Sequence, residues 1–112
     1  MQRGEIWTLR DDNYASKARP VVVIQGNAGD VFDSLILCLL TSYDSSNIET
    51  RIRVAPIPMN GLKKQSYVMP DKIVTVARSE LGEFVGFLSD EQMHEINRQI
   101  AKLLVITKDD LI

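Results

Sequence analysis

Cysteine and histidine are nearly missing from this chain, which has one of each, Cys38 and His94, among 112 residues. A single cysteine excludes an internal disulfide, and one cysteine with one histidine is too few for a zinc site of the usual ligand count. No apolar run approaches the ~20 residues of a membrane-spanning helix, and the N-terminus lacks the apolar stretch of a secretory signal. We therefore expect a protein of the reducing cytoplasm, with no metal, no cofactor and no membrane partner.

Aromatic residues are also scarce at 6%, whereas apolar residues make up 45% of the chain and charged residues 25%. This is the composition of an ordinary globular protein, and the length suits one domain over residues 1–112. The net charge of −2 argues mildly against non-specific binding to nucleic acid. However, residues 1–78 carry a net charge of +2 and residues 79–112 carry −4, so the basic side chains lie outside an acidic C-terminal part.

Several short strands followed by one helix are predicted along the chain. Apolar runs bounded by turn residues predict strands at 5–9, 20–24, 35–40, 51–57, 66–69, 73–76 and 84–88. Pro70-Asp71 separates two of them, and Asn60-Gly61 is a strong hairpin-type turn signal. Many short strands with little helix between them are typical of a small barrel. The predicted fold class is therefore mostly β with a C-terminal α-helix, arranged as a small β-barrel.

The predicted helix begins at Ser89 and ends near Val105. Ser89 and Gln92 stand at the spacing of a capping box. Beyond them, apolar residues recur at helical spacing and form one stripe, consisting of Met93, Ile96, Ile100, Leu103 and Leu104.

The runs 20–24 and 35–40 lack the alternation of a strand with one wet face. A strand that is buried on both faces has this pattern. In so short a chain, we expect the second cover to be the lone helix, a subunit partner, or both, and the two runs therefore predict a homodimer.

Six stretches, in order from residue 3 to about residue 104, resemble the MazF/PemK/Kid toxin family. They are Arg3-Gly4-Glu5-Ile6-Trp7, Arg19-Pro20-Val21-Val22-Val23-Ile24, Leu39-Leu40-Thr41-Ser42, Gly61-Leu62-Lys63-Lys64-Gln65-Ser66-Tyr67-Val68, Asp71-Lys72-Ile73-Val74-Thr75-Val76 and Gly86-Phe87-Leu88-Ser89-Asp90-Glu91. The resemblance implies an SH3-like barrel of the CcdB/PemK type, assembled as a homodimer. It also implies sequence-selective, metal-independent cleavage of single-stranded RNA to 2′,3′-cyclic phosphate and 5′-hydroxyl ends. The partner implied is an antitoxin whose disordered C-terminal segment folds onto the toxin, which would reach operator DNA only through that antitoxin.

The resemblance assigns catalysis to Arg19 and Thr41. A guanidinium offers a rigid fork of donors that suits phosphate oxygens and stays protonated, so Arg19 is expected to stabilise charge on the phosphorane. The hydroxyl of Thr41 can donate to a phosphate oxygen, and Ser42 is a weaker neighbour of the same kind. From position alone, Arg19 would more often be a surface residue that flanks a strand.

The sequence leaves open which group transfers the proton. Some relatives carry a glutamate or histidine before the Arg-Pro pair, where this chain has only Asp11 and Asp12 as candidates. Another subgroup uses an Arg-x-Asp arrangement near Asp71, but the residue two before Asp71 is Met69. The candidates for proton transfer are therefore Asp11, Asp12 and Asp71.

Basic and hydroxyl side chains are predicted to bind the RNA. They are Ser42, Arg51, Arg53, Lys63, Lys64, Ser66 and Lys72. Phosphate contacts of this kind would make binding salt-dependent. Aromatic rings could stack on bases, and the candidates are Trp7, Tyr14, Phe32, Tyr43 and Tyr67, although core packing is the stronger expectation for Trp7 and Phe32.

Two other functions are weighed against the endoribonuclease. A CcdB-like, non-catalytic poison of DNA gyrase would share the fold, but that relative depends on a Trp near its C-terminus, and the only Trp here is Trp7. An SH3-like module for Pro-rich peptides needs an aromatic-lined groove. The low content of aromatic residues argues against such a groove. The sequence does not specify the RNA recognition sequence, the antitoxin or the general base.

Overall fold

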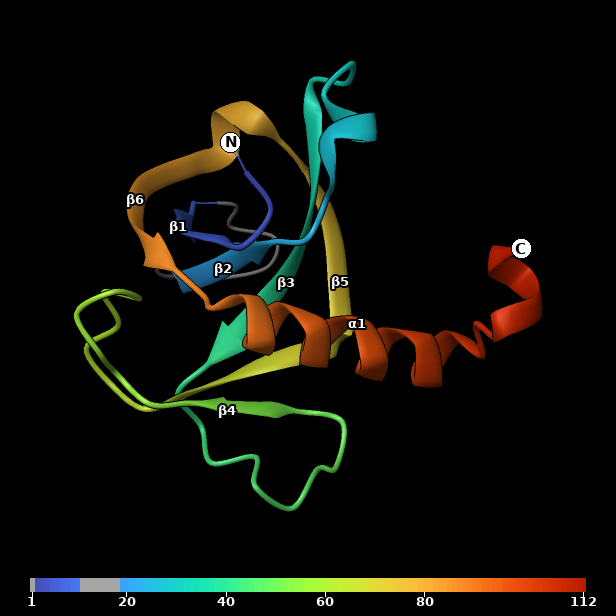
Figure 1. The fold of residues 1–112 in the computed structure, drawn as a ribbon. Coiled ribbons are helices and arrows are strands. Elements are labelled where there is room, and N and C mark those ends of the chain that lie inside the picture. The colour runs from blue at the N-terminus through green and yellow to red at the C-terminus, as the bar shows by residue number, and fades with distance from the viewer. Residues whose placement is uncertain (1, 11–18) are drawn as a thin grey trace.

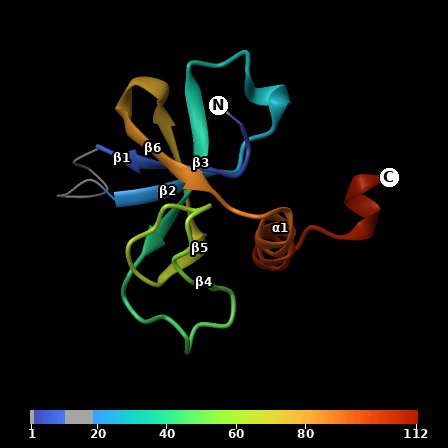
Figure 2. The ribbon, with the colours of Figure 1, turned by 60° about the vertical axis from the view of Figure 1, so that its left-hand side comes forward.

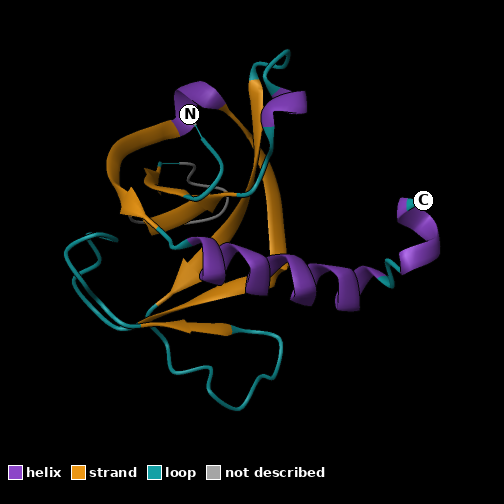
Figure 3. Cartoon of the chain, in the orientation of Figure 1, coloured by secondary structure: helices purple, strands orange, loops and turns teal. Residues whose placement is uncertain are grey.

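The computed structural model describes residues 2–10 and 19–112 as a six-stranded antiparallel sheet with one long helix (Figures 1 and 3). The sheet order is β4-β5-β3-β2-β1-β6. The elements are β1 (Glu5–Leu9), β2 (Arg19–Val23), β3 (Ser34–Thr41), β4 (Ile52–Val54), β5 (Ser66–Ala77), β6 (Leu81–Phe87) and α1 (Asp90–Leu104), with short 3-10 turns at Asn27–Gly29, Arg78–Glu80 and Lys108–Leu111. The predicted fold class, an SH3-like barrel with a C-terminal helix, is confirmed.

Strand β5 is longer than predicted, because Pro70-Asp71 does not divide it. The ladder with β3 shifts register there, with Cys38 opposite Ile73 and its neighbour Leu39 opposite Met69. Residues 70–72 therefore form an irregularity in the ladder. Pro70 has no N–H to donate, and it is tolerated here because this stretch is not part of a regular ladder. The predicted two strands at 66–69 and 73–76 are in fact one bent strand, and β6 likewise begins earlier than predicted.

Both faces of β2 are buried within one chain, as its apolar run predicts, whereas Ile36 of β3 is 39% exposed. The two runs therefore do not by themselves require a partner, and the dimer stays a prediction. One cluster includes the inner face of α1 and consists of Ile6, Val22, Cys38, Leu40, Val54, Val68, Leu88, Met93 and Ile96. The other lies where the curled sheet packs on itself and consists of Leu9, Val21, Val23, Leu35, Leu37 and Val76. Successive residues of β2 thus enter opposite clusters. Within one chain, the curl of the sheet buries this second cluster (Figure 2).

The helix begins as predicted. The Gln92 amide N donates to Ser89 Oγ at 3.1 Å, and the Ser89 amide N donates to Gln92 Oε1 at 2.9 Å, which completes the capping box. The helix ends at Val105 in the left-handed conformation, after which the chain leads away from the sheet (Figure 1). Among the described residues, no helix is both long enough and apolar enough to cross a membrane.

Candidate functional site

An open cavity of about 860 Å³ lies where β2 begins and β3 ends. Six of the side chains predicted to act on RNA line it: Arg19, Thr41, Ser42, Lys63, Lys64 and Ser66. The remaining lining residues are Thr8, Pro20, Leu40, Tyr43, Gly61, Leu62 and Val85. We call this cavity the Arg19 pocket.

The pairing of β2 with β3 explains why Arg19 and Thr41 share this pocket. Val21 lies opposite Leu39, and Val23 lies opposite Leu37. The paired ladder ends at Val21 and Leu39, and the same register extended by two residues would bring Arg19 level with Thr41; both residues line the pocket. Directly opposed residues project from the same face of a sheet and have neighbouring Cβ atoms, so the guanidinium and the hydroxyl can reach one phosphate together.

The Thr41 hydroxyl is already oriented by the main chain. The amide N of Tyr43 donates to Thr41 Oγ1 at 3.1 Å. A hydroxyl can accept two hydrogen bonds and donate one, so this contact occupies a lone pair and leaves the proton free. Thr41 can therefore donate to an anionic oxygen in the pocket.

The loop that carries Lys63 and Lys64 is anchored by a buried asparagine. Asn60 is 1% exposed, and its side chain bonds the backbone of Ala55, Ile57 and Leu62 at 2.9 to 3.2 Å. Gly61 follows with φ of +66°, and a Cβ there would lie 2.1 Å from the carbonyl oxygen of Val85. The loop therefore packs backbone to backbone on β6, which fixes the wall of the pocket from which the two lysines extend.

The described lining of the Arg19 pocket is positively charged. It contains Arg19, Lys63 and Lys64 but no carboxylate and no imidazole. Within residues 2–10 and 19–112, none of these three cations has an ion-pair partner, and no group of three or more His, Cys, Asp or Glu could hold a metal ion. Charged donors without internal partners suit phosphate oxygens.

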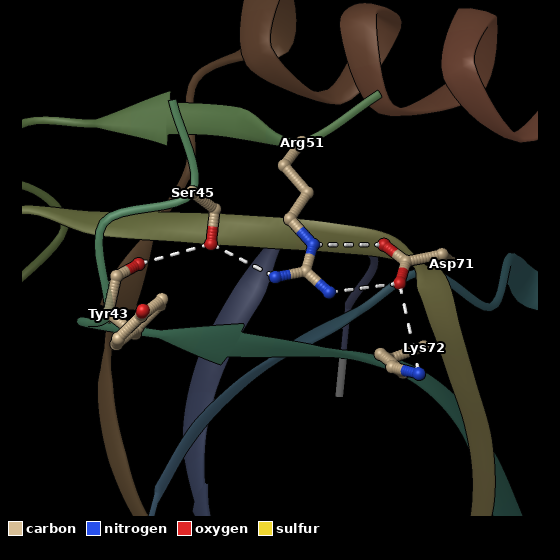
Figure 4. A network of polar contacts seen from close by, with 5 residues as sticks. All are labelled: Tyr43, Ser45, Arg51, Asp71 and Lys72. Atoms are coloured by element: carbon tan, nitrogen blue, oxygen red, sulfur yellow. Dashed lines mark hydrogen bonds and ion pairs between the residues drawn. The ribbon is translucent and has the colours of Figure 1, made fainter. Parts of the chain in front are cut away.

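The candidates for proton transfer do not line the described part of this pocket. Asp11 and Asp12 lie outside the described residues. Asp71 lies elsewhere, in a two-pronged ion pair: Arg51 Nε donates to Asp71 Oδ1 at 3.2 Å, and Arg51 Nη2 donates to Asp71 Oδ2 at 3.1 Å (Figure 4). These hydrogen bonds from Arg51 hold the pKa of Asp71 below its usual value. Asp71 lies outside the Arg19 pocket, and its lowered pKa makes the carboxylate a weaker base. Both observations argue against proton transfer by Asp71.

Three residues predicted to bind RNA also lie outside the Arg19 pocket. Arg51 is occupied by Asp71, and Lys72 lies 3.9 Å from the same carboxylate. Arg53 is on β4, opposite Tyr67. The predicted basic surface is therefore divided, with Lys63 and Lys64 at the pocket and this second group next to β4.

Of the aromatic candidates, Tyr43 alone is both described and part of the pocket lining, and its side chain is highly exposed. Tyr67 is buried at 4% exposure, and Trp7 is half-buried against Phe84, as expected. The core position expected for Phe32 is wrong, because the residue is 59% exposed in the loop before β3. Tyr14 lies outside the described residues.

Thr8, Leu62 and Val85 also line the pocket, although no pattern in the sequence predicted a role for them at the site. Thr8 Oγ1 accepts a hydrogen bond from the amide N of Glu83 at 2.8 Å, so it ties β1 to β6 at this edge. These residues are brought together by the curl of the sheet, which no local pattern in the sequence predicts.

Comparison with known proteins shows the family to which this chain is similar. Residues 2–104 match the family described as PemK-like, MazF-like toxin of type II toxin-antitoxin system. The chain is 36% identical to a probable endoribonuclease MazF of Mycolicibacterium smegmatis, over 95% of this chain and 98% of that protein. It is 30% identical to the endoribonuclease MazF of Staphylococcus saprophyticus, over 89% and 88%.

Solved structures have the same fold. A mycobacterial endoribonuclease in complex with its cognate antitoxin superposes with a TM-score of 0.80 at 25% identity, covering 96% of this chain and 97% of that one. A MazE-MazF complex from Deinococcus radiodurans superposes with a TM-score of 0.78 at 18% identity, covering 96% and 97%. With the family match spanning most of the sequence, this chain belongs to the PemK-like, MazF-like toxins of type II toxin-antitoxin systems.

Proposed function

We propose that this toxin is a sequence-selective endoribonuclease that cleaves single-stranded RNA in the Arg19 pocket. The observation that carries the proposal is that Arg19, Thr41 and two lysines line one cavity, where the described residues provide neither a carboxylate nor an ion-pair partner for the lysines. The relatives named endoribonuclease support the same reaction. The alternative of a non-catalytic gyrase poison is not favoured, because those relatives are nucleases rather than CcdB proteins.

In the proposed reaction, the RNA supplies its own nucleophile. The 2′-oxygen attacks the adjacent phosphorus, the bond to the 5′-oxygen breaks, and the products carry a 2′,3′-cyclic phosphate and a 5′-hydroxyl. Arg19 and Thr41 donate hydrogen bonds to the non-bridging oxygens, where charge develops in the transition state. A base must accept the 2′-proton and an acid must protonate the 5′-oxygen. Asp11 and Asp12 remain the candidates for the base, since the described lining offers none.

Primer extension on a long RNA incubated with the purified toxin and EDTA tests this function. We expect defined cuts in EDTA, and 2′,3′-cyclic phosphate ends on the products. Arg19→Ala should abolish cleavage and Thr41→Ala should reduce it strongly, while circular dichroism shows an unchanged fold. Arg98→Ala is the matched control, because it removes a cation on the exposed side of α1 and should cleave as the unsubstituted toxin does. Dependence on magnesium, 5′-phosphate ends, or activity in Arg19→Ala would contradict the proposal.

We also propose that the toxin acts as a cytoplasmic homodimer. Exposed apolar side chains gather at the C-terminal end, where Leu104 is 61% exposed, Val105 75% and Leu111 78%. Such residues are expected to be covered in an assembly. Sedimentation at micromolar concentration should give about 25 kDa, twice the 12.6 kDa of the chain. A stable monomer would contradict the dimer without affecting the proposed chemistry.

A cognate antitoxin is the proposed partner, because solved relatives occur in complex with theirs. An acidic, disordered C-terminal segment would be attracted to Arg19, Lys63 and Lys64 and would exclude RNA by occupying their pocket. In this proposal, operator DNA is contacted only through the antitoxin. A synthetic antitoxin segment should compete with RNA for the toxin, and simultaneous binding of both would contradict this mode of inhibition.

A further inference from the structure

The turn that leaves the Arg19 pocket is held from two sides. This turn, residues 42–46, follows Thr41 directly and carries Tyr43 into the lining. Its main chain is fixed on both sides of Tyr43: the amide N donates to Thr41 Oγ1 at 3.1 Å, and the carbonyl oxygen accepts from Ser45 Oγ at 3.1 Å. We call it the rim turn.

The first hold comes from Arg51 (Figure 4). Two of its nitrogens engage both carboxylate oxygens of Asp71, and the third, Nη1, donates to Ser45 Oγ at 2.9 Å. Ser45 is 1% exposed, and its hydroxyl in turn donates to the carbonyl oxygen of Tyr43. Arg51 is therefore linked to the main chain of Tyr43 through Ser45. A guanidinium fixed by a bidentate carboxylate has little freedom to move, and all its nitrogens are in use.

The second hold comes from Tyr67, a buried residue of β5. Its hydroxyl donates to Asp44 Oδ1 at 3.1 Å, and it accepts from Gln65 Nε2 at 3.3 Å. Asp44 Oδ1 also accepts from the amide N of Ser46 at 2.9 Å, which closes the turn on itself. The turn is therefore tied to β5 independently of Arg51.

The ring of Tyr43 is left exposed on this rigid support. Tyr43 is 79% exposed, although its amide N and its carbonyl oxygen are both hydrogen-bonded. A flat aromatic face at the rim of a cationic pocket is what a nucleotide base stacks on once its phosphate is bound inside. Because the backbone is already ordered, stacking would lose little conformational entropy on binding.

From these contacts we infer that Tyr43 is a base-stacking residue for a nucleotide next to the phosphate held by Arg19. We further infer that Arg51, with Asp71, is a positioning residue that acts on RNA only through Ser45 and Tyr43. The inference rests on the proposed function and replaces the direct phosphate contact predicted for Arg51. Stacking accepts every base, so Tyr43 supplies affinity and orientation rather than the choice of sequence.

Binding of a fluorescent single-stranded DNA oligonucleotide of mixed sequence tests the inference. This probe lacks the 2′-hydroxyl, so binding is read without any cleavage. Tyr43→Ala should raise the dissociation constant about tenfold, as expected for loss of one stacked base. Tyr43→Phe keeps the ring and should bind within about twofold of the unsubstituted toxin, while Arg98→Met is the control for removal of a remote cation.

The positioning role makes a separate prediction. Ser45→Ala and Arg51→Met should each weaken binding, but by less than Tyr43→Ala does, because Tyr67 still holds the turn through Asp44. Either one combined with Tyr43→Ala should be no worse than Tyr43→Ala alone. The salt dependence of binding should also be unchanged in Arg51→Met, whereas loss of a phosphate contact would lower its slope by about one. Ser45→Ala leaves the ion pair intact, so it tests the link even if Arg51→Met does not fold.

Three results would overturn the inference. They are unchanged binding in Tyr43→Ala, unchanged binding in Ser45→Ala, or a reduced salt slope in Arg51→Met with full additivity. Failure of the unsubstituted toxin to bind the probe would overturn it as well. Normal probe binding without any RNA cleavage would instead contradict the proposed function and leave the stacking role supported.

Discussion

Replacing Asn60 with alanine should destabilise the toxin strongly for a single polar substitution. The Asn60 side chain accepts from the amide N of Ile57 at 3.2 Å and of Leu62 at 3.0 Å, and it donates to the Ala55 carbonyl at 2.9 Å. Alanine would leave three backbone groups without these partners. Each such group costs ~1–3 kcal/mol when fully buried.

Ala55 and Ile57 are exposed residues, so water can reach part of what Asn60 leaves. We therefore expect a loss of ~2–3 kcal/mol in the free energy of unfolding, at the low end of the sum of three buried groups. For a chain of this length, that corresponds to a fall in Tm of roughly 8–12 °C. Urea denaturation followed by circular dichroism would measure the first quantity, and a thermal melt would measure the second.

Asn47→Ala is the matched control, because Asn47 is an exposed loop residue. It should change the free energy of unfolding by less than ~0.5 kcal/mol. If Asn60→Ala also fell within that range, with an unchanged m-value, the three hydrogen bonds would not be what holds the loop. The anchoring of Lys63 and Lys64 would then have to come from the packing of Gly61 on β6 alone.

Three further predictions concern α1, the core and the ion pair. Ser89→Ala should cost ~1 kcal/mol in urea denaturation, because it removes the side-chain acceptor of the capping box; no change would mean that the cap is redundant. Burial raises the pKa of Cys38 to about 12, so a thiol reagent at pH 8 should label it only as fast as the protein unfolds, and rapid labelling of the native protein would contradict this. The pKa of Asp71 is lowered by hydrogen bonds from Arg51, so its stabilisation is present above the usual carboxyl value of ~3.9 and is lost as the pH falls through the lower native value. Urea denaturation between pH 7 and pH 3 should therefore show a shallower acid loss in Asp71→Asn, and an equal loss would refute the linkage.

Local signals in the sequence predicted much of the fold. The spacing of Ser89 and Gln92 gives the start of α1, because a capping box involves only residues three apart. The unalternating run 20–24 correctly indicates a strand buried on both faces. The covering of the second face was not predictable, since it depends on how far the sheet curls, and periodicity carries no information about curl.

The candidate site divides in the same way. The resemblance indicated Arg19 and Thr41, and the register of β2 with β3 explains why both line one pocket. Arg51 pairs with Asp71, which is twenty positions away in the sequence and lies in the irregular part of β5. Neither residue has a neighbour in sequence that signals this contact. Charge therefore suggested a phosphate contact for Arg51, and the resemblance left Asp71 among the candidates for proton transfer.

The pairing of the first strand with the last has a consequence for synthesis of the toxin on the ribosome. β1 lies beside β6, with Glu5 opposite Phe87, and Val85 completes the wall of the Arg19 pocket. A growing chain that already contains Arg19 and Thr41 still has no closed pocket until β6 has emerged and found β1. Translation products that stop before β6 are therefore expected to lack the closed pocket, and the proposed cleavage of RNA would begin only after β6 has been synthesised and has paired with β1.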